Sequence, residues 1–351
     1  MKKKKNLTLL YICINIAVIV LIAVLDPNLK EIDKAFYRIK LPWMMGGFLF
    51  MLMYWLCDAF ITYYSVGVTY EPKSFMKCLK IAMIGQYYSA VTPFASGGQP
   101  AQIYYMTKAG IPAGYGSSAL MIKFLVYQAV LSIYSLVAFC VMGRFMHHYS
   151  TVLFWISLVG FLINAGAIVL IYFLASNKGI VKKIIFKIID WLHKIKVVKD
   201  VEDTRTRLMS HVNDFHSSLD LIKGDGKALF IMLMATALQL TFLFSITYFI
   251  YRGFGLNGDR WIKIIFLQSF LYLAVCYFPT PGAAGASEGG FYIFYQLVFP
   301  KKFIFLAMFF WRIISYYLNI VVGAVVVFSD SIKGLFKPSV MPVTGKNKKQ
   351  G

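Results

Sequence analysis

The strongest constraint on this chain is a run of small and helix-breaking residues, 276–290, that lies between two strongly apolar flanks. Flanks of this kind predict burial in a membrane, where an unpaired backbone polar group costs several kcal/mol. A break in a helix persists at that depth only where it lines a cavity or packs against other protein. The run therefore predicts a site inside the membrane.

An earlier run, residues 92–100, has the same character and aligns with the later run when its numbering is advanced by 188. Within the two runs the identical pairs are Thr92 with Thr280, Pro93 with Pro281, Ala95 with Ala283 and Gly97 with Gly285. The identical pairs outside them are Tyr63 with Tyr251, Gly67 with Gly255, Leu79 with Leu267, Tyr104 with Tyr292, Pro112 with Pro300 and Ala119 with Ala307. Their concentration at Gly and Pro predicts an internal duplication. Paired Gly/Pro-interrupted apolar segments are typical of the substrate site of a transporter.

The composition is that of an integral membrane protein. The chain is 59% hydrophobic and 15% charged, and several apolar runs approach the roughly 20 residues that cross a bilayer. We therefore expect an all-α, polytopic fold. The net charge of +21 lies between the apolar runs, where it indicates a positive-inside bias and anionic lipid rather than nucleic acid. The cysteines form no C-x-x-C pair, so we expect no disulfide framework, metal site or cofactor.

The apolar and polar runs divide the chain into six predicted segments. These are an N-terminal span with an outer loop (1–40), a first repeat with a re-entrant hairpin (41–141), a connecting span (142–174), a basic cytoplasmic amphipathic region (175–227), a second repeat with a re-entrant hairpin (228–329) and a basic tail (330–351). The first span is expected over residues 7–25. A signal peptide is the competing interpretation, but this run ends at Asp26 and Pro27 without a cleavage site.

Basic residues predict the topology. They cluster at the N-terminus, in the region 175–227 and in the tail, which places all three on the cytoplasmic side. With these sides assigned, the spans place the start of the first hairpin in the cytoplasm and the start of the second hairpin outside the cell. The second repeat is then inverted relative to the first. Lys301 and Lys302 fall on the outer side and are the discordant charges.

The basic region predicts an amphipathic helix over residues 180–195. Its apolar residues recur at helical spacing and are Ile180, Val181, Ile184, Ile185, Ile188, Ile189, Leu192 and Ile195. Its opposite face carries Lys182, Lys183, Lys187 and Lys194. Such a helix binds anionic inner-leaflet lipid, and the alternative is a helix docked on the protein's own spans. Residues 201–223 predict a soluble helix, on which His211, Asp214 and His216 form a solvated face rather than a metal site.

Ionisable residues inside spans are functional candidates, because burying a charge is costly. They are Asp58, Lys123 and Arg312, with Glu288 at the predicted start of a half-helix. Lys123 and Arg312 fall one position from repeat equivalence, so we expect two cations to face a pseudo-symmetric centre and bind a phosphate. The alternatives are that Lys123 extends to the cytoplasmic interface and that Arg312 pairs with Glu288 structurally.

The predicted substrate-binding residues are therefore Thr92, Pro93, Ser96, Gly97, Gly98, Gln99, Gln102, Lys123, Thr280, Pro281, Gly282, Gly285, Ser287, Glu288 and Arg312. For the glutamines, hydrogen bonding between helices is the competing interpretation. No catalytic residue is predicted, since the sequence has no nucleophile elbow, no phosphate-binding P-loop and no His-Glu-x-x-His motif.

Two motifs carry a resemblance to a known family. Residues 92–100 (TPFASGGQP) with 108–111 (KAGI), and residues 279–288 (PTPGAAGASE), resemble those of the flippase-like transmembrane family of lysylphosphatidylglycerol synthases, which includes the membrane domain of the multiple peptide resistance factors and stand-alone relatives. The resemblance covers residues 5–335. It implies a bacterial plasma-membrane protein that translocates or handles an anionic or aminoacylated phospholipid, such as lysylphosphatidylglycerol, and in the best-known members lowers sensitivity to cationic peptides. Many relatives carry Arg near position 102, where this chain has Gln102.

Other functions remain open from the sequence. The full-length synthases append a soluble transferase domain, and the tail after Phe328 is too short for one, so we expect no enzymatic activity from this chain by itself. The first alternative is a membrane component of phosphatidylglycerol lysyltransferase that acts with a separate aminoacyltransferase. The second alternative is a small-molecule secondary transporter. The sequence leaves open the lipid, the energy source and whether the chain forms a homodimer.

Overall fold

The computed structural model of the chain describes residues 39–71, 74–176, 178–194, 200–202, 204–206, 209, 213 and 224–333. Every regular element within them is a helix, which confirms the expected all-α fold. The predicted N-terminal span, the trio His211, Asp214 and His216, and the tail beyond residue 333 lie outside the described residues.

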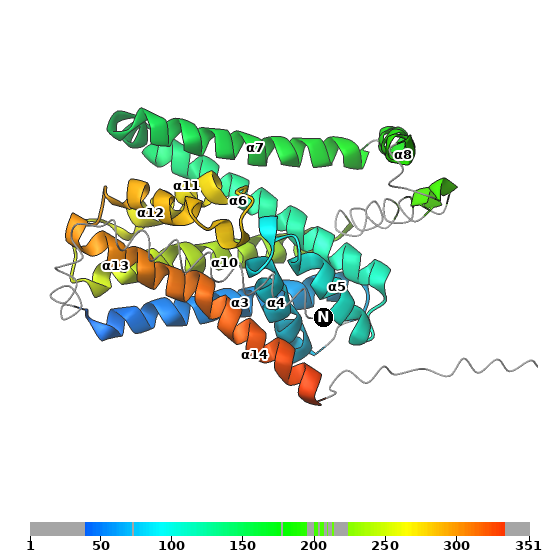
Figure 1. Ribbon diagram of the computed structural model, residues 1–351, viewed down its shortest axis with the longest axis horizontal. Coiled ribbons are helices and arrows are strands. Elements are labelled where there is room, and N and C mark those ends of the chain that lie inside the picture. Colours follow the sequence, from blue (N-terminus) through cyan, green and yellow to red (C-terminus); the bar gives the residue numbers. More distant parts are fainter. Residues whose placement is uncertain are drawn as a thin grey trace, which may run out of the picture.

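Two units of similar design make up most of the bundle (Figure 1). The helices of the first unit are α3 (Leu41–Thr69), α4 (Phe75–Ala90), the short 3-10 turn η2 (Pro93–Ala95), α5 (Gly98–Lys108) and α6 (Ala113–Tyr149). Those of the second unit are α10 (Gly226–Gly253), α11 (Trp261–Val275), the 3-10 turn η3 (Pro281–Ala283), α12 (Ala286–Tyr295), α13 (Lys301–Arg312), the π-helical segment η4 (Ile313–Tyr317) and α14 (Leu318–Lys333).

The backbones of the two units correspond when the first is advanced by 188. Residues 93–95 of η2 then fall on residues 281–283 of η3, and the start of α6 falls on the start of α13. Pro112 and Pro300 cap these last two helices with nearly the same backbone angles, φ −57° and ψ 144° against φ −55° and ψ 145°. Proline fixes φ and lacks an amide hydrogen, so it suits the start of a helix in both units. This correspondence is what an internal duplication produces.

Equivalent first helices of the two units pack against each other in opposite directions. The Lys40 amide before α3 donates to the Gly253 carbonyl at the end of α10, at 2.7 Å. Farther along both helices, the rings of Phe50 and Phe242 meet edge to face with centroids 5.1 Å apart. From the first contact to the second, the residue number rises from 40 to 50 before and along α3 and falls from 253 to 242 along α10. The two helices are therefore antiparallel. An inverted repeat requires this relation, and the orientation in a bilayer and the re-entrant course of the hairpins stay predictions.

The long apolar helices agree with the predicted spans. Within the part of the chain that the structure describes, four helices are long and apolar enough to cross a membrane, namely Leu41–Thr69, Ala113–Tyr149, Gly226–Gly253 and Lys301–Ser329. Two shorter apolar helices cover Thr151–Ala167 and Trp261–Val275. The first of these belongs to α7 (Thr151–Ser176), which lies beside α6 along the outside of the bundle in Figure 1.

The basic helix predicted from the sequence is α8 (Lys178–Lys194), seen end-on past the end of α7 in Figure 1. Lys182, Lys183 and Lys187 are exposed, whereas Ile189 is buried. Its contact with anionic lipid stays a prediction.

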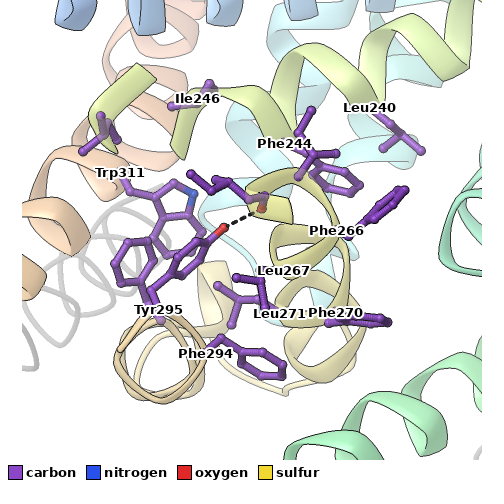
Figure 2. Packing of buried hydrophobic residues seen from close by; sticks show 14 of the residues in the cluster. Leu240, Phe244, Ile246, Phe266, Leu267, Phe270, Leu271, Phe294, Tyr295 and Trp311 are labelled. Carbon is purple, nitrogen blue, oxygen red and sulfur yellow. Dashed lines mark hydrogen bonds between the residues drawn. The ribbon is translucent and has the colours of Figure 1, made fainter. Parts of the chain in front are cut away.

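The core concentrates where the second unit packs on itself. Figure 2 shows Phe294 and Tyr295 of α12 facing Leu267 and Leu271 of α11. The buried Tyr295 hydroxyl donates to the Gln268 side-chain oxygen at 2.6 Å, and the Ile264 carbonyl lies 3.3 Å from the same hydroxyl as a second acceptor. A buried hydroxyl needs such partners, because leaving it unpaired costs about 1–3 kcal/mol. These bonds hold α12 against α11 and so fix one wall of the central cavity described below.

Candidate functional site

The two helix-breaking runs meet at the centre of the bundle. Turn η2 contacts turn η3, so the tips of the two predicted hairpins lie together. Equivalent residues share a left-handed backbone, with φ of 53° at Phe94 and 61° at Gly282, and 54° at Ala95 and 50° at Ala283. Side-chain-bearing residues rarely adopt this region, and such strain concentrates at functional sites. The same unusual turn therefore recurs in both units at the place where they touch.

A cavity of about 260 Å³ opens beside these tips, between the two units. Its lining includes polar side chains from both units, which are Tyr54, Gln86, Ser89, Gln268, Tyr272, Thr280, Ser287, Arg312, Ser315, Tyr316 and Asn319. Apolar side chains, among them Phe94, Phe244, Leu271 and Trp311, cover the rest of its surface. The mixture of an apolar wall and a few polar groups is typical of a ligand site.

Among the described residues, Arg312 is the only charged side chain in this lining. Its Nε donates to Glu288 Oε1 at 2.6 Å, and its Nη2 donates to the Gly282 carbonyl at 3.0 Å. Arg312 is 3% exposed and Glu288 is fully buried. A guanidinium carries five N–H donors, so these two bonds leave donors for which the described residues supply no acceptor. The predicted ion pair between Arg312 and Glu288 is therefore present. Of its two members, Arg312 lines the cavity and Glu288 does not.

Glu288 has a second role at the start of α12. Its Oε2 accepts the Gly285 amide at 2.7 Å, which caps the helix N-terminus. A carboxylate is favourable there because the first amides of a helix lack partners and the helix dipole is positive at that end. One carboxylate thus holds both the guanidinium and the backbone of the second hairpin tip. Glu288 therefore has a structural role as the cap of α12 and, through its pair with Arg312, also positions the cation of the cavity.

Lys123 does not join Arg312 in the lining of the cavity. Its Nζ lies 2.8 Å from Asp58 Oδ1 and donates to Thr62 Oγ1 at 2.9 Å. Gln239 Nε2 donates to the same Asp58 oxygen at 2.8 Å. We expected two cations to face one centre, but only Arg312 of the two lines the cavity. Lys123 is instead paired with the Asp58 carboxylate on α3, outside that lining.

The cavity meets the surroundings of Asp58 at Gln86. Gln86 Nε2 donates to the Tyr54 hydroxyl at 3.0 Å and approaches Asp58 Oδ2 at 3.5 Å. Gln86 and Tyr54 both line the cavity, whereas Asp58 lies behind them. A second buried ion pair therefore lies one side chain away from the candidate ligand site.

The predicted residues of the first hairpin shape its tip rather than the cavity. The Thr92 hydroxyl accepts the Gly97 amide at 2.8 Å, and the exposed Ser96 hydroxyl donates to the Pro93 carbonyl at 2.8 Å. Gln99 is exposed.

Two of these residues join the hairpin's helices. A Cβ on Gly98 would lie 2.0 Å from the Ser89 hydroxyl, so glycine permits α5 to approach α4. Gln102 is buried and donates to the Ile81 carbonyl at 3.3 Å. It acts as the inter-helical hydrogen bond that was the alternative interpretation.

In the second hairpin Thr280, Gly282 and Ser287 line the cavity together with Arg312. Pro281 is buried, and Gly285 supplies the amide that Glu288 accepts. The two hairpins therefore contribute unequally to the cavity. Most of the predicted residues that line it belong to the second hairpin.

Several lining residues were not predicted as ligand contacts. The clearest are Tyr54, Gln86, Tyr272 and Tyr316. Gln86 could have been found by the signal that singled out Gln102, a polar amide inside an apolar run. The tyrosines had no such signal, because tyrosine is common throughout this chain. Within the described residues no group of three or more His, Cys, Asp or Glu side chains could hold a metal ion.

Comparison with known proteins places the chain in a family. No curated protein sequence matches it. The family described as the lysylphosphatidylglycerol synthase TM region matches residues 9–323. This range includes the first unit, both hairpin tips, the Arg312–Glu288 pair and the second unit as far as residue 323 in α14. The chain therefore belongs to the lysylphosphatidylglycerol synthase transmembrane-region family.

Proposed function

We propose that the chain translocates or handles an anionic or aminoacylated phospholipid, such as lysylphosphatidylglycerol, whose head group enters the cavity between the hairpin tips. The observation that carries the proposal is the Arg312 guanidinium, which is buried, lines the cavity and keeps N–H donors without an acceptor among the described residues. Guanidinium groups bind phosphate oxygens through paired N–H donors. The family's description supports a phospholipid as the ligand.

The size of the cavity supports a head group rather than a whole lipid. Its volume of about 260 Å³ is just below the range of roughly 300–1,000 Å³ that is usual for ligand pockets. Acyl chains would then stay in the surrounding bilayer, where they need no protein site. Polar side chains from both units around one cavity would let the head group pass through the apolar region.

A second candidate is a membrane component of lipid aminoacylation that acts with a separate aminoacyltransferase, because the family's description names a synthase. In that case the cavity would hold phosphatidylglycerol for modification without moving it between leaflets.

The deciding experiment is reconstitution of the purified chain into vesicles with fluorescent phosphatidylglycerol or lysylphosphatidylglycerol. Quenching of the outer-leaflet fluorophore by dithionite reports movement between leaflets. We expect wild-type vesicles to lose more than the outer-leaflet signal and an Arg312→Gln variant to lose only that signal. Binding without movement, measured by native mass spectrometry of the same protein, would favour the second candidate.

A further inference from the structure

The charges around the cavity cancel. Among the described residues that line it or lie directly behind its lining, Arg312 pairs with Glu288 and Lys123 pairs with Asp58. Three of these four side chains are at most 4% exposed, and Lys123 is 16% exposed. An anionic head group that enters would therefore add a negative charge to a neutral, buried environment. Burying an uncompensated charge is so costly that buried groups change protonation state instead.

Asp58 is the carboxylate best placed to take up the compensating proton. Both oxygens of Glu288 hold short bonds, to Arg312 at 2.6 Å and to the Gly285 amide at 2.7 Å, and protonation would weaken the helix cap. Among the described residues, Asp58 Oδ2 is approached only by Gln86 Nε2 at 3.5 Å, and Gln86 lines the cavity. Protonation of that oxygen leaves the Lys123 contact to Oδ1 in place. Lys123 would then supply one positive charge for the head group.

The neighbours of Asp58 can also accommodate the protonated state. Gln239, which donates to Asp58 Oδ1, has a buried Oε1 with no partner among the described residues. A turned amide of Gln86 would present an oxygen to the new hydroxyl on Oδ2, because the two ends of an amide exchange donor for acceptor. Among the described residues, the other titratable groups near the pair are Tyr54 and Cys57 on α3, which interact electrostatically with Asp58, and Cys78 on α4, which interacts with Lys123.

We propose that Asp58 is a proton-binding site, and that one proton binds there when an anionic head group enters the cavity, so that lipid and proton move together. This coupling rests on the proposed function, since it takes the head group of that same cavity as its trigger. The proton comes from water and forms the O–H bond of the Asp58 carboxylic acid. A head group without net charge requires no such proton.

The test measures protons taken up per lipid bound. Purified chain in detergent is titrated with dihexanoyl phosphatidylglycerol by calorimetry in two buffers of different ionisation enthalpy, and dihexanoyl phosphatidylethanolamine serves as the ligand without net charge. We expect uptake of about one proton per phosphatidylglycerol and almost none per phosphatidylethanolamine. The phosphatidylglycerol affinity should also fall as the pH is raised, because each bound lipid takes up one proton.

Variants assign the proton to Asp58. Asp58→Asn should bind phosphatidylglycerol without proton uptake and without this pH dependence, because Lys123 then carries a permanent uncompensated charge. The double variant Asp58→Asn with Lys123→Met removes that charge and guards against misfolding of the single variant. It should bind phosphatidylglycerol more weakly, again without proton uptake. The matched control is Asp259→Asn, which breaks a Lys263–Asp259 pair outside the cavity and should leave proton uptake unchanged.

The outcomes separate the coupling from the proposed function. Phosphatidylglycerol binding without proton uptake in the wild type, or uptake that persists in Asp58→Asn, overturns the coupling and leaves the lipid site standing. If neither lipid binds to the wild type, the proposed function fails, and the coupling fails with it.

Discussion

At the scale of single residues, the site depends on one carboxylate that serves two groups. Glu288 binds the Arg312 guanidinium and caps α12, so both the charge of the cavity and the shape of the hairpin tip rely on it. A buried pair of this kind adds little net stability, but removing one partner costs about 3–5 kcal/mol because a buried charge remains unpaired. The paired and single variants therefore distinguish a structural role from a ligand role.

We expect Arg312→Gln and Glu288→Gln to be destabilised singly, and the double variant to recover much of the lost stability. The double variant should nevertheless fail to translocate a fluorescent anionic phospholipid, since the phosphate-binding group is gone. Arg312→Lys should also be impaired, because an ammonium cannot reproduce the planar paired donors. Thermal unfolding and vesicle translocation are measured for all four variants. Full transport by the folded double variant would remove this pair from the site.

Gly282 gives a second prediction at this scale. Its φ is 61°, and a Cβ there would lie 2.2 Å from the Tyr316 ring, so Gly282→Ala should shift Tyr316 and distort the cavity. Strain in this backbone region costs about 1–3 kcal/mol. Gly289→Ala is the matched control, because a Cβ at that helical position meets nothing within 4 Å. Thermal unfolding should show that Gly282→Ala lowers the stability of the protein and that Gly289→Ala does not. Equal behaviour of the two variants would contradict the role of Gly282.

At the scale of elements, the π-helical segment η4 directly follows Arg312 in a helix that continues from α13 through α14. An extra residue in a helical turn rotates the helix that follows, and such segments are frequent at functional sites. Within η4, the Tyr316 hydroxyl donates to the Ala90 carbonyl at 3.0 Å, and just past η4 the Asn319 side-chain oxygen accepts from Trp55 Nε1 at 2.7 Å. The second unit is thereby bonded to α4 and α3 of the first.

The contact of α14 with α4 supplies a prediction at this scale. A Cβ on Gly323 would lie 2.6 Å from Tyr87 Cβ and 3.0 Å from the Met83 carbonyl. Gly323→Leu should therefore push the two helices apart and destabilise the bundle by about 1–3 kcal/mol. Val321→Leu changes an exposed position on the same helix and serves as the control. The thermal unfolding temperature of each variant is measured in detergent. A Gly323→Leu variant that unfolds at the wild-type temperature would contradict the prediction, since α14 could then move away from α4 without cost.

At the scale of the whole molecule, two units with the same backbone plan meet through antiparallel α3 and α10. Two units so arranged would expose equivalent hairpins to opposite sides of a bilayer. The basic residues then decide which side is cytoplasmic.

The topology prediction can be tested by labelling single cysteines in a background without native cysteines. Lys187→Cys on α8 and Asn257→Cys in the loop after α10 are both at exposed positions. An impermeant maleimide added to intact cells should label the second and spare the first, because the basic region is expected in the cytoplasm. Labelling of the cysteine at 187 under these conditions would contradict the inverted arrangement.

The sequence by itself determined the class of fold and the position of the site along the chain. Long apolar runs force helical structure in a membrane, because the backbone must satisfy its hydrogen bonds within each segment. Gly and Pro act locally, so the breaks at residues 92–100 and 279–288 were visible without coordinates. The Arg312–Glu288 pair was also foreseeable, since both charges lie near one break and each needs compensation.

Only the tertiary structure decided which side chains meet across the two units. Lys123 and Asp58 pair because α6 packs on α3, and no local pattern reveals that contact. Gln86 reaches the cavity, whereas the predicted Gln102 turns away to bond the Ile81 carbonyl. The two hairpins also differ at matching glycines, with φ of −82° at Gly97 and 86° at Gly285. Periodicity places a residue on a helix, but the direction in which that residue faces depends on how the helices pack.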